Sequence, residues 1–199
     1  IMILIVDFGS QTCHLISRRI KDLGVDAEIV LPHQALKAVK NRQINGLILS
    51  GGPASVYSKN ALLIDGKIFK LGIPVLGICY GLQVIGHLLG GKVSPGRKKE
   101  YGPTLLNLKS DNLLFRSLPS KLKVWMSHFD TVVDPPDGFR IIGSTPEIRI
   151  AAVESEKNKI YGVQFHPEVH HTQKGGEILS NFIFNICREL PSRKSLSIK

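Results

Sequence analysis

Short apolar runs recur through the first 80 residues, and a helical pattern follows each of them. Apolar side chains in residues 15–23 return at the helical period, and this pattern ends at Gly24. Because parallel strands need crossover connections that pack on the sheet, the alternation predicts a three-layer α/β fold. We expect a mostly parallel twisted sheet with helices on both faces. The expected strands are residues 3–6, 26–31, 46–49 and 74–78, and the expected helices are residues 15–23, 35–40, 60–70 and 81–89.

The pattern changes after residue 91. Residues 92–161 form short β-like segments interrupted by prolines, which predicts antiparallel strands added to the sheet. Residues 176–189 carry one apolar helical face, so we expect a closing helix there. Residues 1–190 are therefore predicted to form one domain, and the polar residues 191–199 a tail or the start of a linker.

Composition limits the compartment and the partners. Hydrophobic residues make up 43% of the 199, and no apolar run approaches the roughly 20 residues that span a bilayer. The opening apolar run has no basic segment before it, so it is interpreted as a strand and not as a signal peptide. Three widely spaced cysteines argue against a disulfide framework and favour the reducing cytoplasm.

The chain carries a formal net charge of +10. Its lysines and arginines are scattered, and no nucleic-acid-binding motif accompanies them. We therefore interpret the charge as a basic solvated surface, or as a docking face for an acidic partner, and expect neither nucleic acid nor a membrane as a ligand.

The segment around Cys79 carries the strongest chemical signal. A predicted strand runs into Gly77-x-Cys79-x-Gly81, and a predicted helix follows. This spacing is typical of a nucleophile elbow, a strained turn that exposes its central side chain at the carboxyl end of a sheet. The helix N-terminus also favours a thiolate. The alternative is a buried structural cysteine.

A second constellation contains His166 and Glu168. Two residues apart in an extended segment, they project to the same side, so Glu168 can orient the imidazole toward a thiol. A metal site formed by His166, Glu168 and His170 is the rival interpretation.

The third constellation is Gly51-Gly52 after a strand. Its N–H groups can face an anion, and an oxyanion hole, a phosphate cradle and a plain turn are all open. A P-loop is disfavoured because no Lys-Ser or Lys-Thr follows at the required spacing.

Together the three constellations resemble those of the class I, triad-type glutamine amidotransferases, a family with a flavodoxin-like fold. Further segments are similar to the GMP synthetase branch of this family. They are residues 7–11, 50–56, 99–102, 124–128, 162–169 and 171–172. The chain departs from the branch at Lys99, where arginine is usual, and at Phe129, where glycine is usual.

The resemblance implies a role for each matching position. Cys79 would attack the glutamine carboxamide, His166 would transfer the proton, and Glu168 would orient His166. The remaining implied residues are the oxyanion N–H groups of Gly52 and Tyr80 and a substrate pocket formed by Gln83, Ser127, Phe129 and Asp130.

The nucleotide-activating chemistry of this branch needs a Ser-Gly-Gly-x-Asp-Ser loop, which the sequence lacks. The resemblance therefore implies a glutaminase that passes ammonia to an ATP-pyrophosphatase partner converting XMP to GMP. ATP and Mg²⁺ are expected on that partner, and no cofactor is expected in this chain. The alternatives are a glutaminase serving CTP, anthranilate or aminodeoxychorismate synthesis, and a non-catalytic regulatory module of the same fold.

Overall fold

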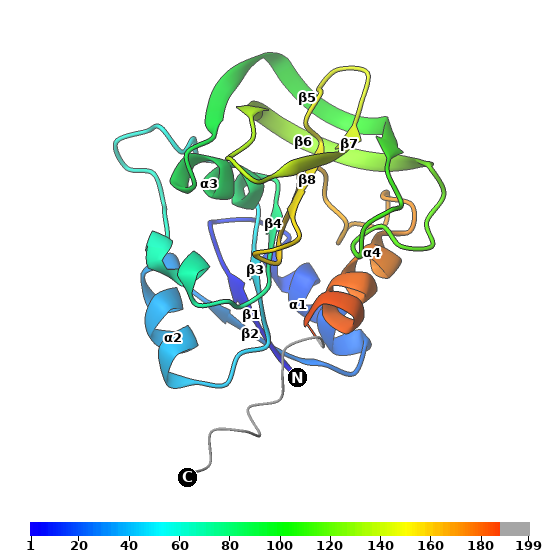
Figure 1. The fold of residues 1–199 in the computed structure, drawn as a ribbon. Helices are drawn as coiled ribbons and strands as arrows, with labels where there is room; N and C mark the ends of the chain where they lie inside the picture. Colours follow the sequence, from blue (N-terminus) through cyan, green and yellow to red (C-terminus); the bar gives the residue numbers. More distant parts are fainter. Residues whose placement is uncertain (188–199) are drawn as a thin grey trace.

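The computed structural model describes residues 1–187, and within them the strands form one nine-stranded sheet (Figure 1). The strand order is β2-β1-β3-β4-β9-β8-β7-β5-β6. The parallel part contains β2 (Asp26–Val30), β1 (Met2–Val6), β3 (Gly46–Leu49), β4 (Val75–Ile78) and β9 (Ile160–Val163). The antiparallel part contains β8 (Ala152–Ser155), β7 (Arg140–Ser144), β5 (Lys92–Leu108) and β6 (Lys121–Asp134). The predicted mixed sheet is therefore confirmed, except that β9, which begins inside the segment predicted as antiparallel, pairs parallel with β4.

Helices cover both faces of the parallel part, as predicted. On one face lie α1 (Cys13–Asp22), α4 (Gly175–Asn181) and the π-helical turn η3 (Phe182–Ile186). On the other lie α2 (Ala35–Asn41), with the short 3-10 turn η1 (Pro32–Gln34) before it, and α3 (Tyr80–Leu88). The sheet is thus the middle layer of three.

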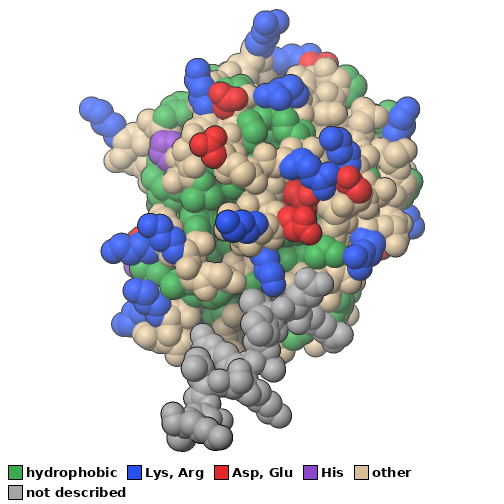
Figure 2. Space-filling model, in the orientation of Figure 1, with side chains coloured by type: hydrophobic (Ala, Val, Ile, Leu, Met, Phe, Trp, Pro, Cys, Tyr) green, Lys and Arg blue, Asp and Glu red, His purple; other side chains and the backbone are tan. Residues whose placement is uncertain are grey.

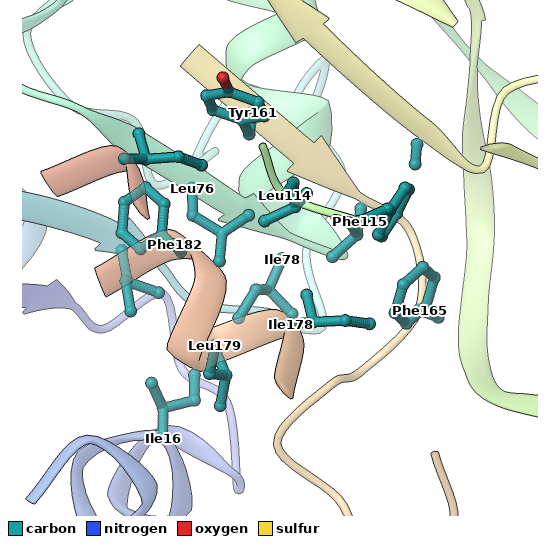
Figure 3. Close-up of a cluster of buried hydrophobic side chains, with 14 of the residues drawn as sticks. Ile16, Leu76, Ile78, Leu114, Phe115, Tyr161, Phe165, Ile178, Leu179 and Phe182 are labelled. Atoms are coloured by element: carbon teal, nitrogen blue, oxygen red, sulfur yellow. The ribbon is translucent and has the colours of Figure 1, made fainter. Parts of the chain in front are cut away.

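Two hydrophobic cores result from the alternation of side chains along each strand. Ile3 and Ile5 of β1 point into one core, and Leu4 and Val6 into the other. Figure 3 shows the first core, in which α1 and α4 pack against β4. Because β1, β3 and β4 are buried on both faces, their sequences are continuous apolar runs, which is why they could be located from sequence.

The antiparallel part differs from the prediction in the length of its strands. We expected short segments, but β5 has 17 residues and β6 has 14, and the two pair as a long hairpin. Pro95 and Pro103 lie inside β5, and the register shifts between Pro95 and Glu100. The bulge that begins at Pro95 releases the next part of the ladder from regular pairing, which accommodates this proline, whereas Pro103 lies in the regular ladder opposite Trp125.

The predicted helix at 60–70 is wrong over its first half. Only η2 (Gly66–Lys70), a 3-10 helix, forms, and the Asp65 side chain caps it by accepting a 2.9 Å hydrogen bond from the Lys67 N–H. Before it the chain is irregular: Ile64 is buried while Leu62 is 46% exposed. The consecutive apolar residues 61–64 have no helical period, and they form an irregular segment instead of a helix.

The closing helix begins one residue before the predicted position, at Gly175, and continues through η3. Its predicted end at residue 189, the domain boundary at 190 and the tail at 191–199 lie outside the described residues. Within the described part, no helix has both the length and the apolar character to cross a membrane. Figure 2 shows Lys and Arg side chains spread over the visible face, with Asp and Glu among them.

Candidate active site

Cys79 occupies the turn between β4 and α3. Its φ of 54° and ψ of −108° lie in a region that residues other than glycine rarely adopt. A Cβ on Gly77 would lie 2.6 Å from Cδ1 of Ile85, and one on Gly81 would lie 2.2 Å from the carbonyl oxygen of Leu49. Both glycines are therefore required by packing, as the elbow motif predicts, and the turn lies at the carboxyl end of β4.

His166 and Glu168 follow β9 at the same edge of the sheet. Nδ1 of His166 lies 2.7 Å from Oε1 of Glu168, and Glu168 is fully buried. Because an ionised carboxylate only accepts hydrogen bonds, Nδ1 carries the hydrogen and Nε2 is the nitrogen available to a thiol. The segment is fixed by the His166 N–H, which donates to the Trp125 carbonyl at 3.1 Å, and by the Thr172 hydroxyl, which donates to the His166 carbonyl at 2.7 Å.

The surroundings of His166 favour its protonated form. Burial alone would lower the pKa of His166, but hydrogen bonds with Cys79 and Glu168, together with their negative charges, raise this pKa to about 10. His166 can therefore take a proton from Cys79 and keep it, as the formation of a thiolate requires. The Cys79 thiol also donates a long hydrogen bond, 3.5 Å, to the Ser127 carbonyl oxygen.

Thr12, at the N-terminal end of α1, and Arg19, in its last turn, hold Glu168 in place. The Thr12 hydroxyl donates a 2.7 Å hydrogen bond to Oε1 of Glu168, and Arg19 Nε donates to the Glu168 carbonyl oxygen at 3.2 Å. Neither residue was predicted, because Thr12 and Glu168 are 156 positions apart. The available signal was that residues 7–12 follow the first strand, at the edge where the other motifs also lie.

Gly51 and Gly52 follow β3 at this edge. A Cβ on Gly51 would lie 3.1 Å from Cε1 of His166, and one on Gly52 would lie 2.4 Å from the carbonyl oxygen of Phe8. A side chain is therefore excluded at Gly52 by the Phe8 backbone and would be in tight contact with His166 at Gly51. The backbone of Gly52 lines the same cavity as Cys79.

Tyr80, the second position implied for the oxyanion hole, directly follows Cys79 and begins α3. Its side chain is buried, and its hydroxyl donates a 2.8 Å hydrogen bond to the Leu62 carbonyl oxygen. Only the backbone of Tyr80 therefore adjoins Cys79, and its N–H belongs to the helix N-terminus, where partial positive charge collects.

One cavity of about 610 Å³ brings these groups together. Its walls come from the carboxyl edge of the parallel strands, the start of α3 and the β5–β6 hairpin. The predicted residues that line it are Gly52, Cys79, Gln83, Ser127, Phe129, Asp130 and His166. This volume is in the range that accommodates a small molecule.

The four implied substrate-pocket residues contribute in different ways. Gln83 is buried, and its amide donates a 2.9 Å hydrogen bond to the Asp130 carbonyl oxygen. It therefore fixes the backbone of Asp130 in the cavity wall. Ser127 presents its carbonyl oxygen to Cys79. Phe129 is 48% exposed at the rim, and its φ is not positive, so the residue found here in place of the usual glycine causes no backbone strain.

The hairpin adds lining residues that were not predicted. Trp125 lines the cavity and contacts the rings of Tyr101 and His171 at centroid distances of 5.3 and 4.5 Å. The alternation along β6 was the missed signal, because its neighbours on both sides are buried and Trp125 therefore faces the opposite way. Lys99 also lines the cavity, with its ammonium 5.7 Å from the centre of the Tyr101 ring.

His128 is buried in the cavity wall. Its Nδ1 donates to the Asp130 carbonyl oxygen at 2.8 Å, and its Nε2 lies 2.5 Å from Oε2 of Glu100 on the facing strand.

The metal interpretation finds no support in the geometry. Across residues 1–187, no group of three His, Cys, Asp or Glu side chains is arranged to hold a metal ion. His166 and Glu168 are hydrogen-bonded to each other, while the ring of His170 stacks on that of His171 at 3.9 Å.

A family model described as glutamine amidotransferase class-I matches residues 4–186. The chain therefore belongs to the class-I glutamine amidotransferases, and the resemblance predicted from the motifs is confirmed.

Within this family the chain is similar to GMP synthases. It is 50% identical over 186 residues to the glutamine-hydrolysing GMP synthase of Staphylococcus epidermidis and 49% identical to that of Staphylococcus aureus. Each comparison covers 94% of this chain and 36% of the relative, so the chain spans about a third of the length of these relatives.

Solved structures confirm the fold class. A GMP synthase subunit from Thermoplasma acidophilum superposes with a TM-score of 0.84 at 34% identity, covering 94% of both chains. A glutamine amidotransferase of Thermotoga maritima shares the fold with a TM-score of 0.69 at 23% identity, covering 85% of this chain and 76% of that chain.

Proposed function

We propose that this chain is a glutaminase that hydrolyses L-glutamine through a γ-glutamyl thioester on Cys79. The observation that carries the proposal is the contact between Cys79, in its strained turn, and His166, whose other nitrogen is held by buried Glu168. A nucleophile, a base and an orienting carboxylate within one cavity form the arrangement that acyl transfer requires.

The first half of the proposed reaction transfers the acyl group. His166 takes the thiol proton, and the Cys79 sulfur adds to the side-chain carbonyl carbon of glutamine. The N–H groups of Gly52 and Tyr80 stabilise the resulting oxyanion. His166 then gives its proton to the departing nitrogen, so that ammonia leaves and the thioester remains.

The second half regenerates the thiol. A water molecule gives a proton to His166 and adds to the thioester carbonyl. The carbon–sulfur bond breaks, glutamate leaves, and Cys79 recovers its proton from His166. The balance is one glutamine and one water consumed for one glutamate and one ammonia released.

The cavity suits an amino acid because it offers one group of each charge. Among the lining residues of the described part, Asp130 is the only carboxylate and Lys99 the only Lys or Arg. We assign the α-ammonium group of glutamine to Asp130 and its α-carboxylate to Lys99. Ser127 and Phe129 form the adjoining wall, and Gln83 acts through the Asp130 backbone.

We further propose that the ammonia is delivered to an ATP-pyrophosphatase domain or subunit that converts XMP to GMP. The similarity to GMP synthases that are much longer than this chain supports this partner. ATP and Mg²⁺ would bind to the partner, and the glutaminase reaction uses no cofactor in this chain. The three free cysteines of the described residues suit the reducing cytoplasm.

A glutamine analogue with an alkylating ketone tests the nucleophile. We expect one adduct, on Cys79, and its loss together with ammonia release in Cys79→Ala. Cys13 is the internal control: it is buried, and burial raises the pKa of its thiol to about 12, so it should not react. Full ammonia release by Cys79→Ala, or labelling of Cys13 in its place, would contradict the proposal.

A further inference from the structure

Two hydroxyl groups from a single loop cap the carboxylate of Asp130. Ser55 Oγ donates a hydrogen bond to Oδ2 of Asp130, and Tyr57 Oη donates one to Oδ1 at 2.5 Å. Both donors belong to the irregular connection between β3 and η2, and they are 75 and 73 positions from Asp130. Asp130 itself is only 5% exposed, and both hydrogen bonds are partly buried.

The loop is anchored so that its hydroxyl groups face inward. Val56, between the two donors, is 2% exposed and packs in the core that also contains Tyr80 of α3. Tyr57, in contrast, is 50% exposed. The Tyr57 ring therefore adds little to the core, and its most specific contact is the hydrogen bond to Asp130.

The backbone of Asp130 is fixed as well. Its carbonyl oxygen accepts hydrogen bonds from Gln83 Nε2 at 2.9 Å and from His128 Nδ1 at 2.8 Å. An ionised carboxylate can accept about four hydrogen bonds, so the hydroxyls of Ser55 and Tyr57 leave acceptor positions for a ligand. Because hydroxyl donors are neutral, they also leave the negative charge of Asp130 in place.

We propose that Ser55 and Tyr57 are positioning residues that hold the Asp130 carboxylate in the orientation that selects the α-ammonium group of the substrate. The inference rests on the proposed glutaminase function and adds to it the residues that set this selectivity. A carboxylate already fixed in its binding rotamer loses no side-chain entropy when the ammonium group arrives. Without the two hydroxyls, Asp130 would sample other rotamers and pair with the ammonium group less well.

The test compares glutamine with its analogue that lacks the α-amino group, 4-carbamoylbutanoate, in the complete glutamine-dependent enzyme. Tyr57→Phe keeps the ring and removes the hydroxyl, and Ser55→Ala removes the other donor. For each variant we expect the KM for glutamine to rise about tenfold, the effect of losing one hydrogen bond to a charged group. We expect kcat to stay within about twofold, because the chemistry at Cys79 is unchanged. The KM for the analogue should not change, so the preference for glutamine shrinks.

Ser58→Ala is the matched control, because it removes a hydroxyl from an exposed residue of the same loop that does not line the cavity. It should leave both KM values unchanged. An unchanged preference in Tyr57→Phe and Ser55→Ala, with active wild-type enzyme, would overturn the inference and leave the glutaminase function standing. An equal rise of KM for both substrates would also overturn it, because it would show a merely structural role for the loop. Failure of the wild-type enzyme to release ammonia would overturn both proposals.

Discussion

Two histidines of the cavity wall, His166 and His128, each have one imidazole nitrogen beside a glutamate. The two pairs differ in what the histidine contacts besides its glutamate. In the first pair, Nδ1 of His166 meets Glu168, and His166 also hydrogen-bonds with the Cys79 side chain. In the second pair, Nε2 of His128 meets Glu100, and Nδ1 of His128 donates to the Asp130 carbonyl oxygen. The same two residue types therefore place an imidazole against the Cys79 side chain in one place and against a backbone carbonyl in the other.

The difference shows that a buried histidine–glutamate pair does not by itself mark a catalytic base. A backbone carbonyl neither gives up nor receives a proton, so His128 can fix only the geometry of the wall. A thiol exchanges its proton, so in the proposed function His166 changes the protonation state of Cys79. We therefore expect substitutions in the first pair to lower kcat, and substitutions in the second to act on substrate binding and stability.

His166→Asn should have the largest effect. It removes the base while keeping a polar side chain of smaller size, and we expect kcat for glutamine hydrolysis to fall by about 10³-fold or more. Steady-state ammonia release measures this. His87→Asn is the matched control, because His87 is exposed on α3. A His166→Asn variant with near-normal kcat would remove the distinction between the two pairs.

Glu168→Gln should have the next largest effect, a fall in kcat of about 10²- to 10³-fold, because the imidazole loses its orienting charge. The pH profile gives a second readout. Glu168 helps to raise the pKa of His166 to about 10. Above that pH His166 has no proton to give to the departing ammonia, so wild-type activity should be lost as the pH rises through that value. Without the carboxylate this pKa falls, and the alkaline limit of activity should move to lower pH. An alkaline limit that stays in place would show that Glu168 does not act through His166.

His128→Asn should have the smallest effect on the chemistry. Loss of its buried hydrogen bond to the Asp130 carbonyl oxygen and of its contact with Glu100 should lower the free energy of unfolding by about 1–3 kcal/mol and raise the KM for glutamine several-fold, while kcat stays within about threefold. Thermal unfolding and the kinetic constants measure these effects together. A kcat loss as large as that of His166→Asn would mean that the second pair also takes part in proton transfer.

The sequence allowed the parts of the site that depend on local spacing to be predicted. The elbow at Cys79 is defined by glycines two positions away on each side, and the partners His166 and Glu168 are two positions apart. The parallel strands β1, β3 and β4 could be located because burial on both faces requires continuous apolar runs. These features need no knowledge of which distant segments meet.

The rest depends on tertiary register. Glu100 faces His128 only because the hairpin register shifts after Pro95, and no local pattern encodes that shift. Ser55 and Tyr57 contact Asp130 from the irregular loop between β3 and η2. The second part of this loop was wrongly predicted as helix. Long-range hydrogen bonds of this kind follow from the fold as a whole and not from the periodicity of a segment.

The central claim is that Cys79 carries the γ-glutamyl group during turnover. The most direct measurement is acid quenching of the complete enzyme during glutamine hydrolysis, followed by mass spectrometry of the peptide that contains Cys79. We predict a glutamyl adduct on Cys79, and in Cys79→Ala neither an adduct nor ammonia release. Ammonia release at the wild-type rate from Cys79→Ala, or a glutamyl group on a different residue, would contradict the account.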